Sequence, residues 1–270
     1  MAKDIGRNVT ASTLTITQEL AEQAAKAGER QGMTVAEIVN AALHQYLHHD
    51  PKSNAVYLSA PVDALMKGCY EENTSIRELK LHGNFGLGTF NNLDGEMMML
   101  DGTVYQLKED GFAHEVADTV ETPFSCVTFF TPTTVEKIDR ELDYVGFKNL
   151  LDRLMPSENV FSALRIDGDF SYIRVWSVPK QKAHLPISEV KPAVFEYNDV
   201  KGTLAGFYTP RFIKSLLNPG FHLHFLSEDR LHGGHMDQCR LNRLSIGIQI
   251  IPRLELNLPI TLDYLTAKLI

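Results

Sequence analysis

The sequence predicts an α+β protein in which β-strands predominate and a short strand-helix-helix module comes first. After residue 89 the chain is mostly apolar runs rich in β-branched and aromatic residues, separated by turn residues. The first fifty residues instead carry apolar residues at the three-and-four spacing of helices. Pro51, within the polar segment 50–54, marks a linker. With 270 residues and 44% hydrophobic content, the chain can bury one large core or two modest ones, so we expect domains over residues 1–50 and 55–270.

The N-terminal segment has signals for one strand and two helices. The alternating run 13–17 predicts a short strand, followed by helices over 18–31 and 35–48. Gly32 is placed to end the first helix, and Thr34 with Glu37 forms a capping box for the second. A strand and two helices are too small to close a core, so we expect this unit to pair with a second copy.

Residues 8–48 resemble the ribbon-helix-helix family of dimeric DNA-binding modules, through Leu-Thr-Ile-Thr and Gly-Met-Thr-Val-Ala-Glu-Ile-Val. In that family, strand side chains that are usually basic or amide-bearing enter the major groove. Here the corresponding side chains are mostly Thr and Ser, and residues 1–50 hold four basic against six acidic residues. This balance weakens the electrostatic attraction that nucleic-acid binding requires. We therefore favour a homodimer over specific DNA binding, with a simple helical extension as the alternative.

The second domain is predicted to contain helices, hairpins and long strands. A two-residue turn at Asp101-Gly102 predicts a hairpin between 97–100 and 103–107. The glycine-rich stretch 83–88 lacks the dinucleotide-binding spacing and is expected to be a loop. The remaining predicted elements are helices over 60–71 and 134–154, a second hairpin at Asp167-Gly168 between 161–166 and 170–178, and strands over 203–208, 221–226 and 241–251.

Composition excludes several classes of protein. The net charge of −8 disfavours a nucleic-acid-binding surface over the whole molecule. No apolar run is long enough to span a bilayer, and the N-terminus lacks the apolar core of a secretory signal, so we expect a cytoplasmic protein. Cys69, Cys126 and Cys239 are odd in number and widely spaced, which predicts reduced packing residues.

His222, His224 and His235 form the most informative pattern in the chain. On a strand, His222 and His224 share one face, and a strand returning after Gly233-Gly234 brings His235 against them. Three imidazoles with one open position are typical of a catalytic zinc site. The alternatives are a surface cluster, a cupin metal site, or a hydrolase that uses a zinc-bound hydroxide.

Residues 56–269 resemble the alpha-acetolactate decarboxylase family. The motifs that carry the resemblance are His-Gly-Asn-Phe-Gly-Leu-Gly-Thr-Phe-Asn-Asn-Leu-Asp-Gly-Glu at 82–96, Ala-Leu-Arg-Ile-Asp-Gly at 163–168, and Gly-Phe-His-Leu-His-Phe followed by Gly-Gly-His. The resemblance implies a cytoplasmic, usually dimeric zinc enzyme that converts 2-acetolactate to acetoin and carbon dioxide. It also implies a mixed β-sheet plus a barrel-like β domain.

The resemblance assigns roles to individual residues. His222, His224 and His235 match the zinc ligands, whereas His232 stands where the family has another residue. Glu96 matches the active-site glutamate, although its local sequence alone is typical of a solvated carboxylate beside a turn. Pocket-lining positions of the family match Thr89 and Val178.

The chain departs from the family where the substrate carboxylate is expected to bind. Trp176 replaces the family's arginine and is expected to line the pocket, while Arg174, on the same strand face, is expected to pair with the carboxylate. Tyr208 replaces a second arginine, and the glutamate-bearing tail of the family has no counterpart after residue 263. Two outcomes follow. The first is a decarboxylase that acts on acetolactate or on another small 2-hydroxy-3-oxo acid, with a reshaped carboxylate pocket. The second is a non-enzymatic metabolite-binding protein whose N-terminal helices dimerise or contact DNA.

Overall fold

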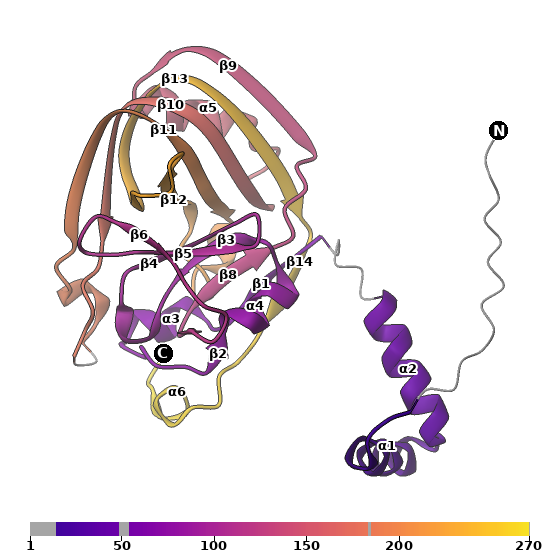
Figure 1. Ribbon diagram of the computed structural model, residues 1–270. Helices are drawn as coiled ribbons and strands as arrows, with labels where there is room; N and C mark the ends of the chain where they lie inside the picture. The colour runs from indigo at the N-terminus through magenta and orange to yellow at the C-terminus, as the bar shows by residue number, and fades with distance from the viewer. Residues whose placement is uncertain (1–14, 49–53, 183–184, 270) are drawn as a thin grey trace, which may run out of the picture. The chain divides into compact units, whose positions relative to one another are not determined.

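The structure, a computed structural model, describes residues 15–48, 54–182 and 185–269. The chain divides into two compact units, residues 1–50 and 51–270, shown in Figure 1.

The first unit contains helices α1 (Gln18–Gln31) and α2 (Val35–His48), which confirms both helix predictions. The backbone of Gly32 is left-handed, with φ of 67°, and ends α1. The capping box is also present, because the Thr34 N–H donates to Glu37 Oε2 (2.7 Å) and the Glu37 N–H donates to Thr34 Oγ1 (3.3 Å). Within the predicted strand 13–17, residues 13–14 lie outside the described residues and 15–17 form no strand.

The second unit contains a seven-stranded mixed sheet. Its only parallel pair among the described strands is β1 with β14, at one edge. In spatial order the strands are β14 (Arg253–Leu256), β1 (Ala55–Leu58), β8 (Ser125–Thr128), β3 (Phe85–Thr89), β4 (Glu96–Leu100), β5 (Thr103–Leu107) and β6 (Ala113–Glu115). The short elements around it are α3 (Val62–Met66), α4 (Ile76–His82), the pair β2 (Thr74–Ser75) and β7 (Glu121–Thr122), and α6 (Leu262–Thr266).

A second, antiparallel sheet is built from longer strands, which curve over the first sheet in Figure 1. They are β10 (Phe161–Ser177), β11 (Ala193–Thr209), β12 (Gly220–Ser227), β13 (Gly233–Ile251) and β9 (Thr134–Leu142). β13 pairs with both β12 and β10, so each of the four strands β10 to β13 pairs with two others of this set. Helix α5 (Tyr144–Leu154) packs against the face of this sheet that carries Leu223 and Phe225. The two sheets and their helices agree with the predicted α+β class, but no closed barrel is assigned among the described strands.

The apolar core lies in layers on both faces of each sheet. Between the sheets, Leu87 and Met98 of the first pack with Ala163 and Phe207 of the second. Alternation along β4 sends Met97 and Met99 to the opposite face, against α4. The even-numbered positions of β4 therefore point at the second sheet, and Glu96 is the first of them.

The prediction of one helix over 134–154 is wrong in its first half. Residues 134–142 form β9, which pairs with the Leu244 and Ile246 region of β13. The helix begins only after Asp143, whose side chain accepts a hydrogen bond from the Gly146 N–H (2.8 Å). Pairing with a distant strand overrides the local helical preference.

The predicted hairpin at Asp167-Gly168 is also wrong, whereas the one at Asp101-Gly102 is confirmed. Asp101 and Gly102 have φ of 54° and 81°, the positive values that a tight two-residue turn needs. Gly168 has no such φ and pairs with Gly202 and Leu244 on both sides, so β10 runs straight through it.

Other boundaries differ from the predictions for identifiable reasons. The helix predicted over 60–71 is only α3, since the chain turns at Gly68, with φ of 94°. The predicted loop 83–88 contains most of strand β3. A Cβ on Gly86 would lie 2.2 Å from the Cys126 carbonyl oxygen, so glycine here permits close strand packing. Strand 221–226 is confirmed, and the strands predicted over 203–208 and 241–251 are parts of longer ones.

Two predictions from composition can be compared with the structure. Cys69, Cys126 and Cys239 are buried free thiols, as expected. None of the helices in the described part of the chain has the length and apolar character needed to cross a membrane.

Candidate metal centre and active site

The three predicted histidines meet between the two sheets. His222 and His224 share one face of β12, and His224 lies directly opposite His235 in the β12–β13 pairing. Each of the three offers one ring nitrogen, and these atoms all lie within 4.8 Å of one another. Among the described residues this is the one group of at least three His, Cys, Asp or Glu side chains close enough to hold a metal.

The protonation states of these imidazoles suit a metal. Burial lowers the pKa of His222 to about 4 and that of His224 to about 3, and it lowers the pKa of His235 well below the usual value. All three are therefore neutral at pH 7, the form in which imidazole binds metals.

Hydrogen bonding determines which nitrogen of His224 is available. Nδ1 lies 2.7 Å from the Met97 carbonyl oxygen, which can only accept, so Nδ1 carries the proton and Nε2 keeps its lone pair. That Nε2 lies 3.2 Å from Nε2 of His222. His222 Nδ1 is buried without a hydrogen-bond partner among the described residues. Two ligand nitrogens facing each other, with a third in reach, fit a zinc ion.

Glu96 lies beside the histidines. Its Oε2 is 3.5 Å from His224 Nε2, and the residue is only 7% exposed. Desolvation raises the pKa of this carboxyl to about 8, so it holds a proton at pH 7. Thr89 pairs with Glu96 across β3 and β4, and its hydroxyl donates to the Gly95 carbonyl (2.7 Å).

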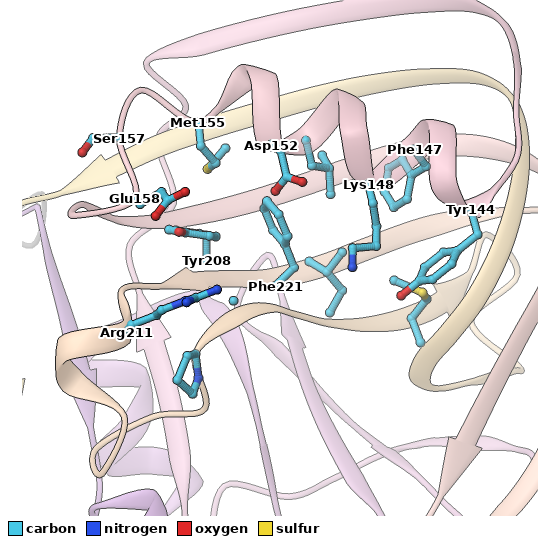
Figure 2. Close-up of a pocket in the computed structure, with 15 residues that line it drawn as sticks. Tyr144, Phe147, Lys148, Asp152, Met155, Ser157, Glu158, Tyr208, Arg211 and Phe221 are labelled. Carbon is cyan, nitrogen blue, oxygen red and sulfur yellow. The ribbon is translucent and has the colours of Figure 1, made fainter.

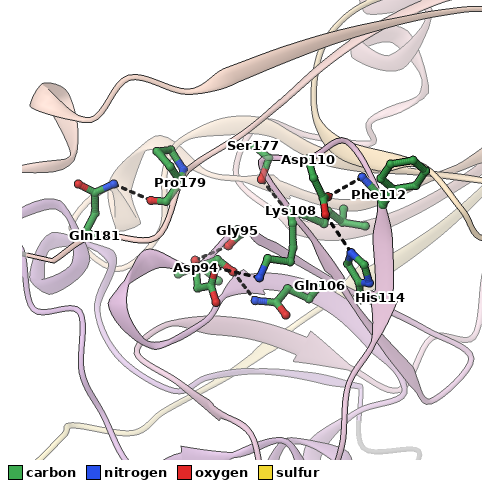
Figure 3. Close-up of polar contacts among 12 residues, drawn as sticks. Asp94, Gly95, Gln106, Lys108, Asp110, Phe112, His114, Ser177, Pro179 and Gln181 are labelled. Carbon is green, nitrogen blue, oxygen red and sulfur yellow. Dashed lines mark hydrogen bonds and ion pairs between the residues drawn. The ribbon is translucent and has the colours of Figure 1, made fainter.

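Polar contacts fix the turn that leads into Glu96, as Figure 3 shows. The Asp94 carbonyl accepts a hydrogen bond from Gln106 Nε2 (2.6 Å), and its carboxylate pairs with Lys108 Nζ (3.5 Å). The Ser177 hydroxyl donates to the Leu107 carbonyl (2.6 Å), which ties the end of β10 to the same hairpin. These contacts hold the turn before Glu96 in a fixed position relative to the second sheet.

The segment before this turn has an unusual backbone. Asn92 and Leu93 have φ of 62° and 53°, values that side-chain-bearing residues rarely adopt. Two backbone hydrogen bonds hold Asn92 there, from its N–H to the Tyr70 carbonyl (2.8 Å) and from the Gln181 N–H to its own carbonyl (2.7 Å). Leu93 lines a cavity that opens onto the histidines.

A cavity of about 70 Å³ opens onto the histidines. This volume is far below the several hundred Å³ typical of drug-sized ligands, so it suits a molecule of few atoms. Its walls are Val62, Leu65, Met66, Gly88, Thr89, Leu93, Glu96, Phe124, Trp176, Ile187, Asn218, His222 and His235.

The structure brings most of the predicted site residues to this cavity. Thr89, Glu96, Trp176, His222 and His235 line it, and His224 contacts the lining residue His222, with 3.2 Å between their Nε2 atoms. The apolar wall from α3 was not predicted as part of the site, and neither were Phe124, Ile187 and Asn218. The apolar members look like ordinary core residues in the sequence, and only the fold reveals that they border a cavity.

Two predicted residues are not brought to the cavity. Val178 is buried in the core between the sheets. Arg174 is on β10, about one-third exposed, and its guanidinium pairs with Asp237, with Nε donating to Oδ2 at 2.6 Å. The expectation that Arg174 reaches the pocket finds no support in this geometry.

A larger groove, of about 700 Å³, lies on the other face of the second sheet, under α5 (Figure 2). Phe221 and Leu223 line it, since they alternate with the histidines along β12. Tyr208 also lines this groove and is not among the residues that line the cavity at the histidines. His232 is remote from the trio as well; its Nδ1 faces the Gly111 carbonyl oxygen at 3.1 Å.

A family model described as alpha-acetolactate decarboxylase matches residues 56–270, which is most of the chain and includes every residue that lines the cavity. The chain belongs to the alpha-acetolactate decarboxylase family. The match begins after the N-terminal unit, which lies outside it. Membership in this family argues against the cupin alternative, and the complete burial of His224 argues against a surface cluster.

Individual relatives agree. An alpha-acetolactate decarboxylase of Methanosarcina mazei is 38% identical over 80% of this chain and 76% of its own length. One of Bacillus licheniformis is 36% identical over 81% of this chain and 87% of its own. The crystal structure of alpha-acetolactate decarboxylase from Bacillus subtilis is 35% identical, with a TM-score of 0.78 over 80% of this chain and 93% of that one.

Proposed function

We propose that the protein decarboxylates 2-acetolactate to acetoin and carbon dioxide, with a zinc ion held by His222, His224 and His235. The observation that carries the proposal is the buried glutamic acid beside three neutral imidazoles in a small cavity. Family membership supplies the reaction, and the chemistry of these side chains supports it.

When bound, zinc would supply a Lewis acid that withdraws electron density from the carbonyl and hydroxyl oxygens of the substrate. The imidazoles would hold it through neutral nitrogens, with the His224 tautomer set by the Met97 carbonyl. The apolar wall of the cavity excludes water, which strengthens every electrostatic interaction inside it.

Glu96 would donate the proton that the enediolate needs. Loss of carbon dioxide breaks a carbon–carbon bond, and its electron pair passes onto the neighbouring carbonyl group as an enediolate. The carbon that carried the carboxylate must then take up one proton to give the hydroxyketone. Burial raises the pKa of the Glu96 carboxyl in the metal-free site, and Glu96 is anchored at the start of β4, so it would be placed to deliver that proton from one side.

The substrate carboxylate would meet no cationic side chain. Among the described residues that line the cavity there is neither lysine nor arginine, and Arg174 is engaged with Asp237. We therefore leave Arg174 out of the proposed site and propose that Trp176 and Thr89 line the carboxylate region. An apolar surrounding favours loss of a carboxylate as neutral carbon dioxide.

A non-enzymatic metabolite-binding protein is the second candidate. Trp176 at the arginine position, with no replacement cation, favours it. In this candidate the N-terminal unit would dimerise or contact DNA. For either function we propose a cytoplasmic homodimer.

The test is to load the full chain with zinc, add 2-acetolactate and follow acetoin. We expect turnover, with His235→Ala inactive and Glu96→Gln slowed about 10²–10⁴-fold, as for the loss of a general acid. His232→Ala is the matched control, because it removes a histidine outside the trio and should leave turnover intact. No acetoin from zinc-loaded protein, together with retained binding of the substrate, would favour the second candidate.

A further inference from the structure

Trp176 makes a closer ring contact with one of the proposed metal ligands than those ligands make with one another. Its indole stacks on the imidazole of His235, with ring centroids 4.0 Å apart and planes 19° from parallel. The other ring contacts of His235 are longer and more tilted, at 4.7 Å and 37° to His222 and 5.2 Å and 53° to His224.

The pairing of β10 with β13 brings the two rings of this stack together. Trp176 and His235 are directly opposite each other in the β10–β13 pairing, just beyond an irregularity next to Arg174 and Val175. Gly234 lets the strands approach, because a Cβ there would lie 2.8 Å from the Trp176 carbonyl oxygen. Side chains directly opposite on neighbouring strands form the contacts that hold a sheet's geometry.

The three histidines differ in what orients them. A hydrogen bond to the Met97 carbonyl holds His224. For His235, no hydrogen bond to a ring nitrogen is found within the described residues, and its flat contact is with the indole. A metal ligand usually needs such a supporting contact to fix its ring plane.

We propose that Trp176 is a positioning residue that holds the His235 imidazole in the plane needed to bind a metal ion. The stack also favours the metal-bound form electrostatically. A bound cation draws electron density from the imidazole, and the negative face of an indole attracts a ring made more positive. An arginine at this position would lack that face and add a positive charge. The inference rests on the proposed metal site, but not on decarboxylation.

The test is a metal titration of the full-length apo protein and of variants at position 176. We expect Trp176→Leu, which keeps apolar bulk but has no ring, to weaken zinc binding about 10–100-fold, the usual effect of losing a supporting contact. Trp176→Phe keeps an aromatic face and should stay within about threefold of wild type. The matched control is Phe112→Leu, which removes an aromatic ring that contacts His232, outside the trio.

Two spectroscopic readouts separate positioning from general stability. Cobalt(II) absorption reports the ligand geometry, and we expect Trp176→Leu, but not Trp176→Phe, to alter its bands. Since Trp176 is the chain's only tryptophan, its fluorescence should change on metal binding in wild type and in Phe112→Leu. Circular dichroism of the apo forms verifies folding.

The possible failures are distinguishable. Wild-type binding of zinc that Trp176→Leu retains unchanged, with unchanged cobalt bands, would overturn the inference and leave the metal site standing. Absence of metal binding by wild type would overturn both. A Trp176→Phe protein as impaired as Trp176→Leu would show that the indole's shape, and not its aromatic face, is what matters, which also contradicts the proposal.

Discussion

Replacing Glu96 by glutamine in metal-free protein should change how stability depends on pH. In the folded chain, burial raises the pKa of this carboxyl from 4.5 to about 8. Between these two values the unfolded chain releases the proton while the folded chain keeps it. The contribution of this carboxyl to the free energy of unfolding is therefore highest below pH 4.5 and falls as the pH rises to about 8. Glutamine cannot ionise, so the variant lacks this fall.

The size of the effect follows from the two pKa values. A difference of about 3.5 pKa units at about 1.36 kcal/mol each corresponds to about 5 kcal/mol, an upper estimate. At pH 5 less than about 1 kcal/mol has been lost, and by pH 9 nearly all of it. The stability of Glu96→Gln relative to wild type should thus rise by up to about 4 kcal/mol between pH 5 and pH 9.

Urea denaturation with a chelator present, at pH 5 and pH 9, measures this difference. Glu115→Gln, an exchange at an exposed position of β6, is the control and should follow wild type at both pH values. If Glu96→Gln and wild type lose stability in parallel, the carboxyl ionises normally in the fold, and the argument for Glu96 as a proton donor at pH 7 fails.

Four further predictions concern the metal and the fold. Zinc at 100 times its dissociation constant should stabilise the protein by about 2.7 kcal/mol, seen as a higher Tm, and His222→Ala should abolish the gain. Gly86→Ala places a Cβ 2.2 Å from a carbonyl oxygen and should cost about 2–3 kcal/mol in urea denaturation; unchanged stability would contradict the close strand packing. Gly102→Ala, with φ of 81° but no atom within 4 Å, should cost only about 1–2 kcal/mol. Thr34→Ala should destabilise α2 by about 1 kcal/mol, measurable as lost helical circular dichroism on heating.

Sequence reasoning worked where the deciding contacts are close along the chain. Gly32, Thr34 and the Asp101-Gly102 turn act on neighbouring residues, and the structure has the helix ends and the hairpin they predict. The same reasoning failed for residues 134–142 and for Asp167-Gly168. There the backbone groups pair with β13, which lies 99 to 114 residues further along for β9 and 76 for Gly168, and no local signal encodes that partner.

The sequence by itself identified the candidate metal-binding histidines, because His222, His224 and His235 need only strand alternation and one return of the chain to meet. The tertiary structure alone decided what surrounds them. It buried Glu96 between two sheets, which changes the carboxyl from an ionised group to a protonated acid. It also paired Arg174 with Asp237 and laid Trp176 on His235, although both residues share a strand face. Desolvation and cross-strand contact depend on which distant segments are neighbours, and only the packed fold specifies them.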